Sequence, residues 1–219
     1  MSEQNGLPAG WTHATFLDFA KLVNGRAYKR HEMLQEGTPL LRIQNLNGGD
    51  RWFYSDMELH PDKYCESGDL LYAWSATFGP YIYSGPRAIY HYHIWKVLPR
   101  QGMSKKFGFY LLGWISDSVK AQAHGVAMPH MTKGGMEAWP IVLPPLNEQH
   151  RIVAKIDALQ AHSRRAREAL NTLPALLNRF RQSVLAAAFR GDLTANWRVQ
   201  NRDVEPASVL LDRIRADRK

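Results

Sequence analysis

Apolar side chains between residues 147 and 190 recur at steps that alternate between four and three. Of the eleven positions in this series, ten are apolar and only Ser163 is polar. The apolar members, which we call the seam, are Ile152, Ile156, Leu159, Ala166, Leu170, Leu173, Leu177, Phe180, Val184 and Ala187. A mean period of 3.5 residues is typical of a helix that packs along its length against another helix. The pattern therefore predicts a rod, about 66 Å long at 1.5 Å per residue, that spaces or docks parts of an assembly.

Two residues set limits on this rod. Pro174 lies within the seam and has no amide hydrogen, so we expect the helix to kink or split there. Gly191 is a natural helix stop. We therefore divide the chain into a globular region over residues 1–143, a long spacer helix over 144–191, and a connector with a further helix over 192–219.

The last of these regions begins with a polar stretch, Asp192–Val204. An amphipathic pattern starts at Pro206 and reaches Lys219 without a capping residue. This ending is what a truncated chain or an interrupted gene would produce.

Residues 1–143 show short alternating and helical patterns in mixture. The expected elements are a helix over Thr15–Val23, strands over Pro39–Gln44, Leu70–Trp74, Ala88–Val97 and Ile141–Leu143, and a helix over Phe107–Ile115 continuing toward Val119. In the strand over Pro39–Gln44, we expect Arg42 and Gln44 to point outward. The predicted fold class is α+β: a mixed α/β domain followed by a long coiled-coil-forming helix.

The composition describes a basic globular protein. Its 45% hydrophobic residues exclude a disordered chain, and a net charge of +8 favours a polyanionic partner. That charge is uneven: residues 1–144 hold 14 basic and 12 acidic residues, whereas residues 145–219 hold 14 and 8. A single cysteine, Cys65, excludes an internal disulfide and a cysteine zinc site. Without a transmembrane or signal pattern, we expect a cytoplasmic protein.

The usual sequence signatures of enzymes are missing. The chain has no phosphate-binding glycine loop, no nucleophile elbow and no paired-histidine zinc helix. His91 and His93 would share one face of the predicted strand and could hold a metal, but no third ligand follows. A surface or core histidine pair explains them better, and an inert thiol explains Cys65 better than a reactive one. Most of the tryptophans should lie in the core, with a subset lining a groove.

Three stretches of the globular region have side chains suited to reading DNA. Arg42, Gln44 and Asn45 can pair with guanine and adenine edges. Trp74, Ser75 and Thr77 follow a buried strand. His130 and Lys133 lie in a loop with phosphate-binding groups, and Lys105 and Lys106 could also hold phosphates. Each stretch can also be a solvated loop, and for any single residue we favour that interpretation.

Five segments resemble one family in the right order. Ile141–Val153 (IVLPPLNEQHRIV) resembles the junction P-L-P-P-L-x-E-Q-x-x-I-V of specificity subunits from type I restriction–modification systems. The others are Leu7–Trp11 (LPAGW), Gly68–Ser75 (GDLLYAWS), Gly125–Met131 (GVAMPHM) and Leu185–Thr194 (LAAAFRGDLT), each similar to a family motif.

The resemblance implies a non-catalytic subunit that reads one half of a split double-stranded DNA site. Its helix would space this target-recognition domain from a second one and dock methyltransferase subunits, with the restriction subunit joining the complex. S-adenosylmethionine, ATP and magnesium would belong to those partners. A full subunit has two domains and two helices, whereas this chain has one of each, so we expect an antiparallel homodimer.

Three further interpretations stay open at this point. The chain can be a detached specificity chain of a fused restriction–methylation enzyme. It can be a metal-dependent hydrolase that uses the two histidines, or an oligomerisation device with no DNA role.

Overall fold

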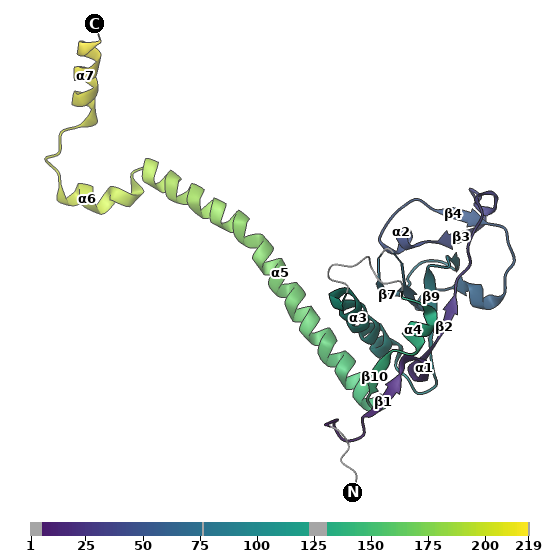
Figure 1. Cartoon of the computed structure of the whole chain (residues 1–219). Helices are drawn as coiled ribbons and strands as arrows, with labels where there is room; N and C mark the ends of the chain where they lie inside the picture. The colour runs from purple at the N-terminus through teal and green to yellow at the C-terminus, as the bar shows by residue number, and fades with distance from the viewer. Residues whose placement is uncertain (1–5, 76, 123–130, 219) are drawn as a thin grey trace. The chain divides into compact units, whose positions relative to one another are not determined.

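The computed structural model describes residues 6–75, 77–122 and 131–218 (Figure 1). The chain divides into two compact units, Met1–Ala158 and Leu159–Lys219, and each is described by itself. The strands are β1 (Thr12–Thr15), β2 (Ala20–Asn24), β3 (Thr38–Leu41), β4 (Phe53–Ser55), β5 (Tyr64–Cys65), β6 (Leu70–Ala73), β7 (Gly79–Ile82), β8 (Ala88–Tyr90), β9 (Ile94–Pro99) and β10 (Pro140–Leu143). The α-helices are α1 (Phe16–Phe19), α2 (Ile43–Leu46), α3 (Lys105–Gln122), α4 (Lys133–Glu137), α5 (Leu146–Phe189), α6 (Ala195–Gln200) and α7 (Ala207–Asp217).

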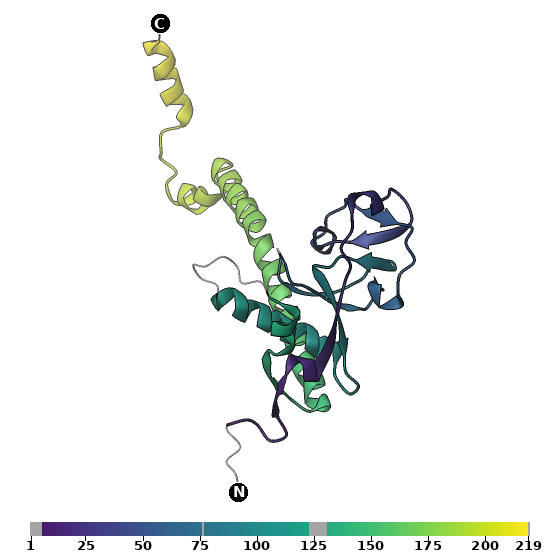
Figure 2. The ribbon, with the colours of Figure 1, turned by 45° about the vertical axis from the view of Figure 1, so that its right-hand side comes forward.

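The first unit is built around two four-stranded sheets, with orders β2-β9-β6-β7 and β4-β3-β8-β5. A two-stranded ribbon pairs β1 with β10 in antiparallel register. Helix α3 packs on β7, β6 and β9, so it covers one face of the first sheet (Figures 1 and 2). This mixed architecture, continued by the long helix α5, confirms the predicted fold class.

Strand β6 shows how the layers are held together. Its four residues are all buried, and the side chains of adjacent strand residues point to opposite faces. Leu70 and Tyr72 enter the large core under α3, whereas Leu71 enters a second core that also contains Leu41 and Tyr90. Because one strand supplies both cores, the two sheets are stacked layers of one domain. The predicted buried strand over Leu70–Trp74 is confirmed except for its last residue.

Three predicted elements of this unit are wrong in part. The expected helix over Thr15–Val23 is a single turn, α1, followed by strand β2. The strand over Pro39–Gln44 ends at Leu41, so Gln44 lies in helix α2 and not on an outward strand face. The strand over Ala88–Val97 is interrupted by a turn at residues 91–93. In each case the segment is short, and tertiary pairing sets its limits more strongly than local propensity.

The start of α5 belongs to the first unit. Gln149 is only 1% exposed, and its Oε1 accepts a hydrogen bond from the Ser104 amide at 3.0 Å. Its Nε2 donates to the Pro144 carbonyl at 2.9 Å. Lys106 Nζ forms a 2.6 Å ion pair with Asp157 Oδ2. The unit therefore extends to Ala158, beyond the residue 143 boundary expected from sequence.

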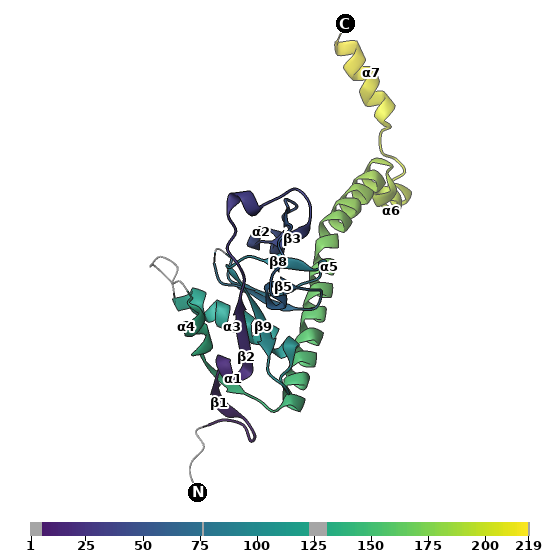
Figure 3. The same cartoon turned by 90° about the vertical axis from the view of Figure 1, so that its right-hand side faces the viewer.

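The second unit begins within α5, which continues without a break through Pro174 to Phe189 (Figure 3). The helix is therefore not split at Pro174. Gly191 adopts a left-handed conformation with φ of +83° and ends the helix, as predicted. The connector after it is partly helical, because α6 occupies Ala195–Gln200.

The seam divides at the unit boundary. Ile152 and Ile156 are half-buried, and Ile152 packs against the large core of the first unit. Beyond Ala158 the seam is exposed: Leu159 58%, Leu170 61%, Leu173 47%, Leu177 66%, Phe180 68% and Val184 39%. Within the described part of this unit these six side chains are exposed, whereas Ala187 near the end of α5 is half-buried.

Candidate nucleic-acid interface

Three separate segments of the first unit meet around a hollow of about 370 Å³, which we call the polar hollow. Its lining residues are Arg42, Ile43, Gln44, Asn47, Ser75, Thr77, His91 and His93. Arg42, Gln44, Ser75 and Thr77 are residues that the sequence singled out for DNA reading, and the structure brings them together. No carboxylate occurs among the described residues that line it.

Helix α2 presents one side of the polar hollow. Asn45, another predicted contact, is used internally: its Oδ1 accepts from the Arg42 amide, and its Nδ2 donates to the Gly49 and Arg51 carbonyls. Asn47 Nδ2 donates to Thr77 Oγ1 at 3.1 Å, which ties α2 to the loop after β6. Asn45 therefore shapes the loop that carries Arg42 and Gln44.

The turn between β8 and β9 presents the opposite side. The imidazole rings of His91 and His93 lie 4.8 Å apart, and His91 Nδ1 accepts from the His93 amide. Burial lowers the pKa of His91 to about 4, with further lowering from His93 and Arg42. Burial also lowers the pKa of His93. Both rings are therefore neutral near pH 7. His91, whose Nδ1 already accepts from the His93 amide, has its Nε2–H left to donate, whereas His93 can present a donor or an acceptor.

Gly25 makes this arrangement possible. A side-chain Cβ at Gly25 would lie 2.2 Å from the His91 carbonyl oxygen, so only glycine allows the chain to cross the turn so closely. Because Gly25 follows the helix expected over Thr15–Val23, its sequence position suggests a helix stop, whereas the structure uses it for a backbone crossing. No local pattern in the sequence distinguishes the two roles.

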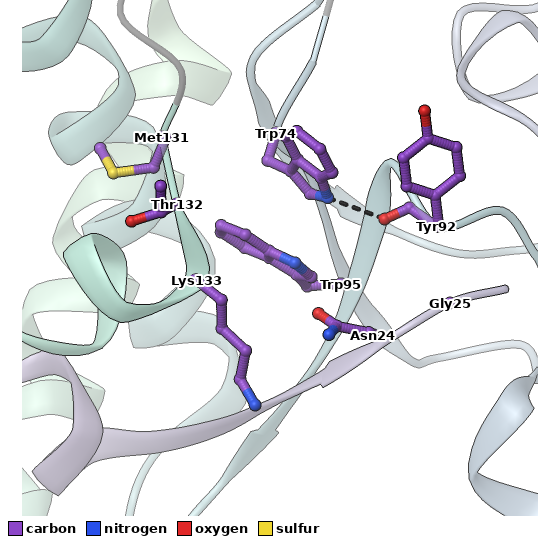
Figure 4. Close-up of a pocket in the computed structure, with 8 residues that line it drawn as sticks. All are labelled: Asn24, Gly25, Trp74, Tyr92, Trp95, Met131, Thr132 and Lys133. Carbon is purple, nitrogen blue, oxygen red and sulfur yellow. Dashed lines mark hydrogen bonds between the residues drawn. The ribbon is translucent and has the colours of Figure 1, made fainter. Parts of the chain in front are cut away.

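Figure 4 shows a second hollow, of about 490 Å³, which we call the aromatic hollow. It is lined by Asn24, Gly25, Trp74, Tyr92, Trp95, Met131, Thr132 and Lys133. Trp74 Nε1 donates to the Tyr92 carbonyl at 2.8 Å. The Trp74 ring also meets the ring of His93, which lines the polar hollow, at 5.0 Å. The two hollows are therefore neighbours across this contact, and together they gather Trp74 and Lys133 with the four predicted residues above.

Other predicted contacts lie elsewhere. Lys105 Nζ donates to the Gly68 carbonyl, and Lys106 pairs with Asp157 on α5, so neither lines a hollow. His130 falls outside the described residues. Sequence reasoning missed Asn24 and Asn47, which come from segments with no distinguishing pattern. It noticed His91 and His93, but as a possible metal pair.

Metal-dependent hydrolysis gains little support from the geometry of the two histidines. Within the described ranges, no group of three or more histidine, cysteine, aspartate or glutamate side chains is placed to hold a metal ion. Cys65 is buried, and burial raises the pKa of its thiol to about 12, as expected of an inert group.

The described helices include none with the length and apolar character needed to span a bilayer.

Most tryptophans of the first unit lie in or against a core, as predicted. Trp95 is 2% exposed, Trp74 and Trp139 are half-buried against the large core, and Trp52 packs against the second. Trp114 is the exception at 59% exposed. The predicted groove-lining subset is present in Trp74 and Trp95.

Comparisons with known proteins agree on one family. The sequence model of the type I restriction modification DNA specificity domain matches residues 8–173. The chain is 27% identical over 205 residues to the Escherichia coli type I restriction enzyme EcoBI specificity subunit, covering 92% of this chain and 42% of that protein. It is 40% identical over 82 residues to the EcoKI specificity subunit of Escherichia coli strain K12, covering 36% and 18%.

Solved structures show the same fold. The HsdS subunit from Thermoanaerobacter tengcongensis matches with a TM-score of 0.65 and 23% identity, over 87% of this chain and 48% of that one. A chain from a study of complex assembly and conformational transition in the type I R-M system matches with a TM-score of 0.67 and 23% identity, over 88% and 49%. The chain thus spans less than half the length of the curated relatives it matches. With most of its length matched by the family model, the chain belongs to the type I restriction–modification DNA specificity family.

Proposed function

We propose that this chain reads one half of a bipartite double-stranded DNA target and has no catalytic activity of its own. One observation carries the proposal. Separate segments of a DNA-specificity domain converge on a hollow that has an arginine, an amide, hydroxyls and two neutral imidazoles, and no carboxylate among its described lining residues. Such groups read base edges by hydrogen bonding in the major groove.

The roles follow from the chemistry of each side chain. Arg42 suits the two acceptors of guanine. Gln44 Nε2 donates one hydrogen to the Arg51 carbonyl at 2.9 Å, and its second N–H and its Oε1 remain to pair with adenine. Ser75 and Thr77 suit base edges or phosphates, and Lys133 suits a phosphate. Asn45 supports the loop, and Lys106 holds the start of α5, so we leave both out of the contact surface.

We further propose that the exposed seam beyond Ala158 docks helices of partner chains. Relatives of this chain are named as specificity subunits of type I restriction enzymes, which suggests methyltransferase and restriction subunits as partners. The exposed leucines, with Phe180 and Val184, would find their mates in a second copy arranged antiparallel. S-adenosylmethionine, ATP and magnesium would be bound by the partner subunits.

The test is methylation-site sequencing of DNA from cells that co-express this chain with its methyltransferase subunit. We expect methylated adenines within one interrupted motif, and a palindromic motif if two identical chains form the reader. Methylation that follows no motif, or none above cells lacking the chain, would refute the proposal.

A further inference from the structure

We propose that the aromatic hollow holds one nucleobase that is unstacked from the target DNA when the chain binds. This inference rests on the proposed DNA-reading function. It assigns a specific ligand, a single nucleobase, to the aromatic hollow, whose lining differs chemically from that of the polar hollow. The polar hollow offers hydrogen bonds to paired bases, whereas the aromatic hollow offers mainly ring and methylene surface.

The wall of the aromatic hollow is a ladder of stacked rings. Tyr72 and Trp95 stack with centroids 5.8 Å apart and 15° between planes, and Trp95 and Trp74 stack at 5.8 Å and 21°. Tyr72 is fully buried, Trp95 is 2% exposed and Trp74 is half-buried, so exposure increases along the ladder toward the hollow. A planar base can stack on such a platform, and the interaction tolerates any base because each has a π face.

Two polar side chains stand at this wall. Asn24 is directly opposite Trp95 in the β2–β9 pairing, and Figure 4 shows its amide beside the Trp95 ring. That amide has both a donor and an acceptor for a base edge. Lys133 extends from α4 across the hollow, with its ammonium 3.4 Å from Glu137 on its own helix. The two side chains are partly exposed, Lys133 at 38% and Glu137 at 23%, so water screens the pair and Lys133 can exchange it for the phosphate of the unstacked nucleotide.

The neighbourhood argues for DNA as the source of the occupant. The Trp74–His93 contact separates the aromatic hollow from the polar hollow, so a duplex read in one lies next to the other. No carboxylate lines either hollow among the described residues, and the nearby Glu137 carboxylate, outside the lining, is neutralised by Lys133. The volume of about 490 Å³ also lies within the range of small-molecule sites, roughly 300–1,000 Å³.

The test uses the complex of this chain with its methyltransferase subunit and a duplex carrying the motif found by methylation sequencing. 2-Aminopurine replaces one base at a time, with the methylated adenine set aside because methyltransferases extrude their own target. We expect one further position whose fluorescence changes several-fold on binding. At that position an abasic nucleotide on the opposite strand removes the pairing cost, so binding should tighten by about tenfold.

Trp74→Ala should abolish both the fluorescence change and the tightening, whereas Trp74→Phe keeps a stacking ring and should retain them in part. Trp114→Ala is the matched control, because this exposed tryptophan on α3 lines neither hollow. Lys133→Gln tests the site without altering the ring ladder, and it should reduce the gain in affinity that the abasic nucleotide produces.

The outcomes separate this inference from the proposed function. Two outcomes would overturn the inference and leave the proposed DNA reading intact. In the first, a methylation motif is found but no second position changes its fluorescence. In the second, the fluorescence change persists in a folded complex of the Trp74→Ala variant. The absence of any motif instead removes the proposed function.

Discussion

The two units of this chain use similar apolar residues in opposite ways. In the first unit, large side chains such as Leu71 and Tyr72 are fully buried. In the second, Leu177 and Phe180 are 66% and 68% exposed. The first unit therefore completes its own core, whereas the second keeps an apolar surface available. Exposed apolar patches of this kind mark sites of association.

The largest expected effect comes from charging the exposed seam. Replacing both Leu177 and Phe180 with glutamate should abolish self-association and docking of partner helices. Burying such a side chain contributes about 1.5–3 kcal/mol, and in a dimer each substitution acts in both chains. Sedimentation equilibrium at micromolar concentration should show a shift from dimer to monomer, while circular dichroism keeps the signal of the folded first unit.

Gln182→Glu is the control, because this exposed residue lies outside the seam on the same helix. It should leave the mass unchanged. If the double variant stays dimeric, the seam is not the interface.

The rod was predictable from sequence because its signal is local. A period of 3.5 residues specifies a helix wherever the chain folds, and α5 spans Leu146–Phe189. Sequence could not show that Ile152 packs on the first unit while Leu170 stays exposed. The difference in burial between Ile152 and Leu170 depends on which turns of α5 contact α3 and the residues just before α3.

The sequence predicted several residues of the site but not how they are arranged in space. Arg42, Gln44, Ser75 and Thr77 have suitable chemistry, but their meeting in one hollow depends on stacking β3 and β6 in different sheets. The fate of Asn45 shows the limit of reasoning from residue type, since its amide is used up by its own loop. The turn at residues 91–93 shows another, because an alternating pattern does not reveal where a strand breaks.

The next prediction concerns the boundary between the units. Gln149→Leu should destabilise the first unit by about 2–4 kcal/mol, because it leaves the Ser104 amide and Pro144 carbonyl buried without partners. Thermal or urea unfolding followed by tryptophan fluorescence measures the loss. Asn147→Leu removes an exposed amide two residues earlier and should cost little. Equal losses for both variants would show that Gln149 does not anchor α5.

A smaller and more selective effect is expected in the polar hollow. Arg42→Ala should relax the methylation motif at one base position, a loss of about 1–3 kcal/mol of discrimination. Arg51→Ala is a close control, because both guanidinium groups lie over the Phe53 ring, at 5.6 Å and 5.1 Å, but Arg51 does not line the hollow. A motif left unchanged by Arg42→Ala would remove this residue from the readout.

The effect expected to be smallest at neutral pH is an acid-dependent loss of stability in the first unit, which contains His91. His91 has a pKa of about 4 in the folded chain against 6.5 for the free side chain, mainly because of burial, with His93 and Arg42 facing it. Between pH 6.5 and 4 the unfolded chain therefore binds a proton that the folded chain does not. Stability should be fully present above pH 6.5 and should fall as the pH drops through this window. His91→Gln should flatten that decline in melting temperature, whereas His13→Gln, which removes an exposed imidazole on β1, provides the control. An unchanged decline in His91→Gln would mean that other groups, such as His93, govern the acid sensitivity of the first unit.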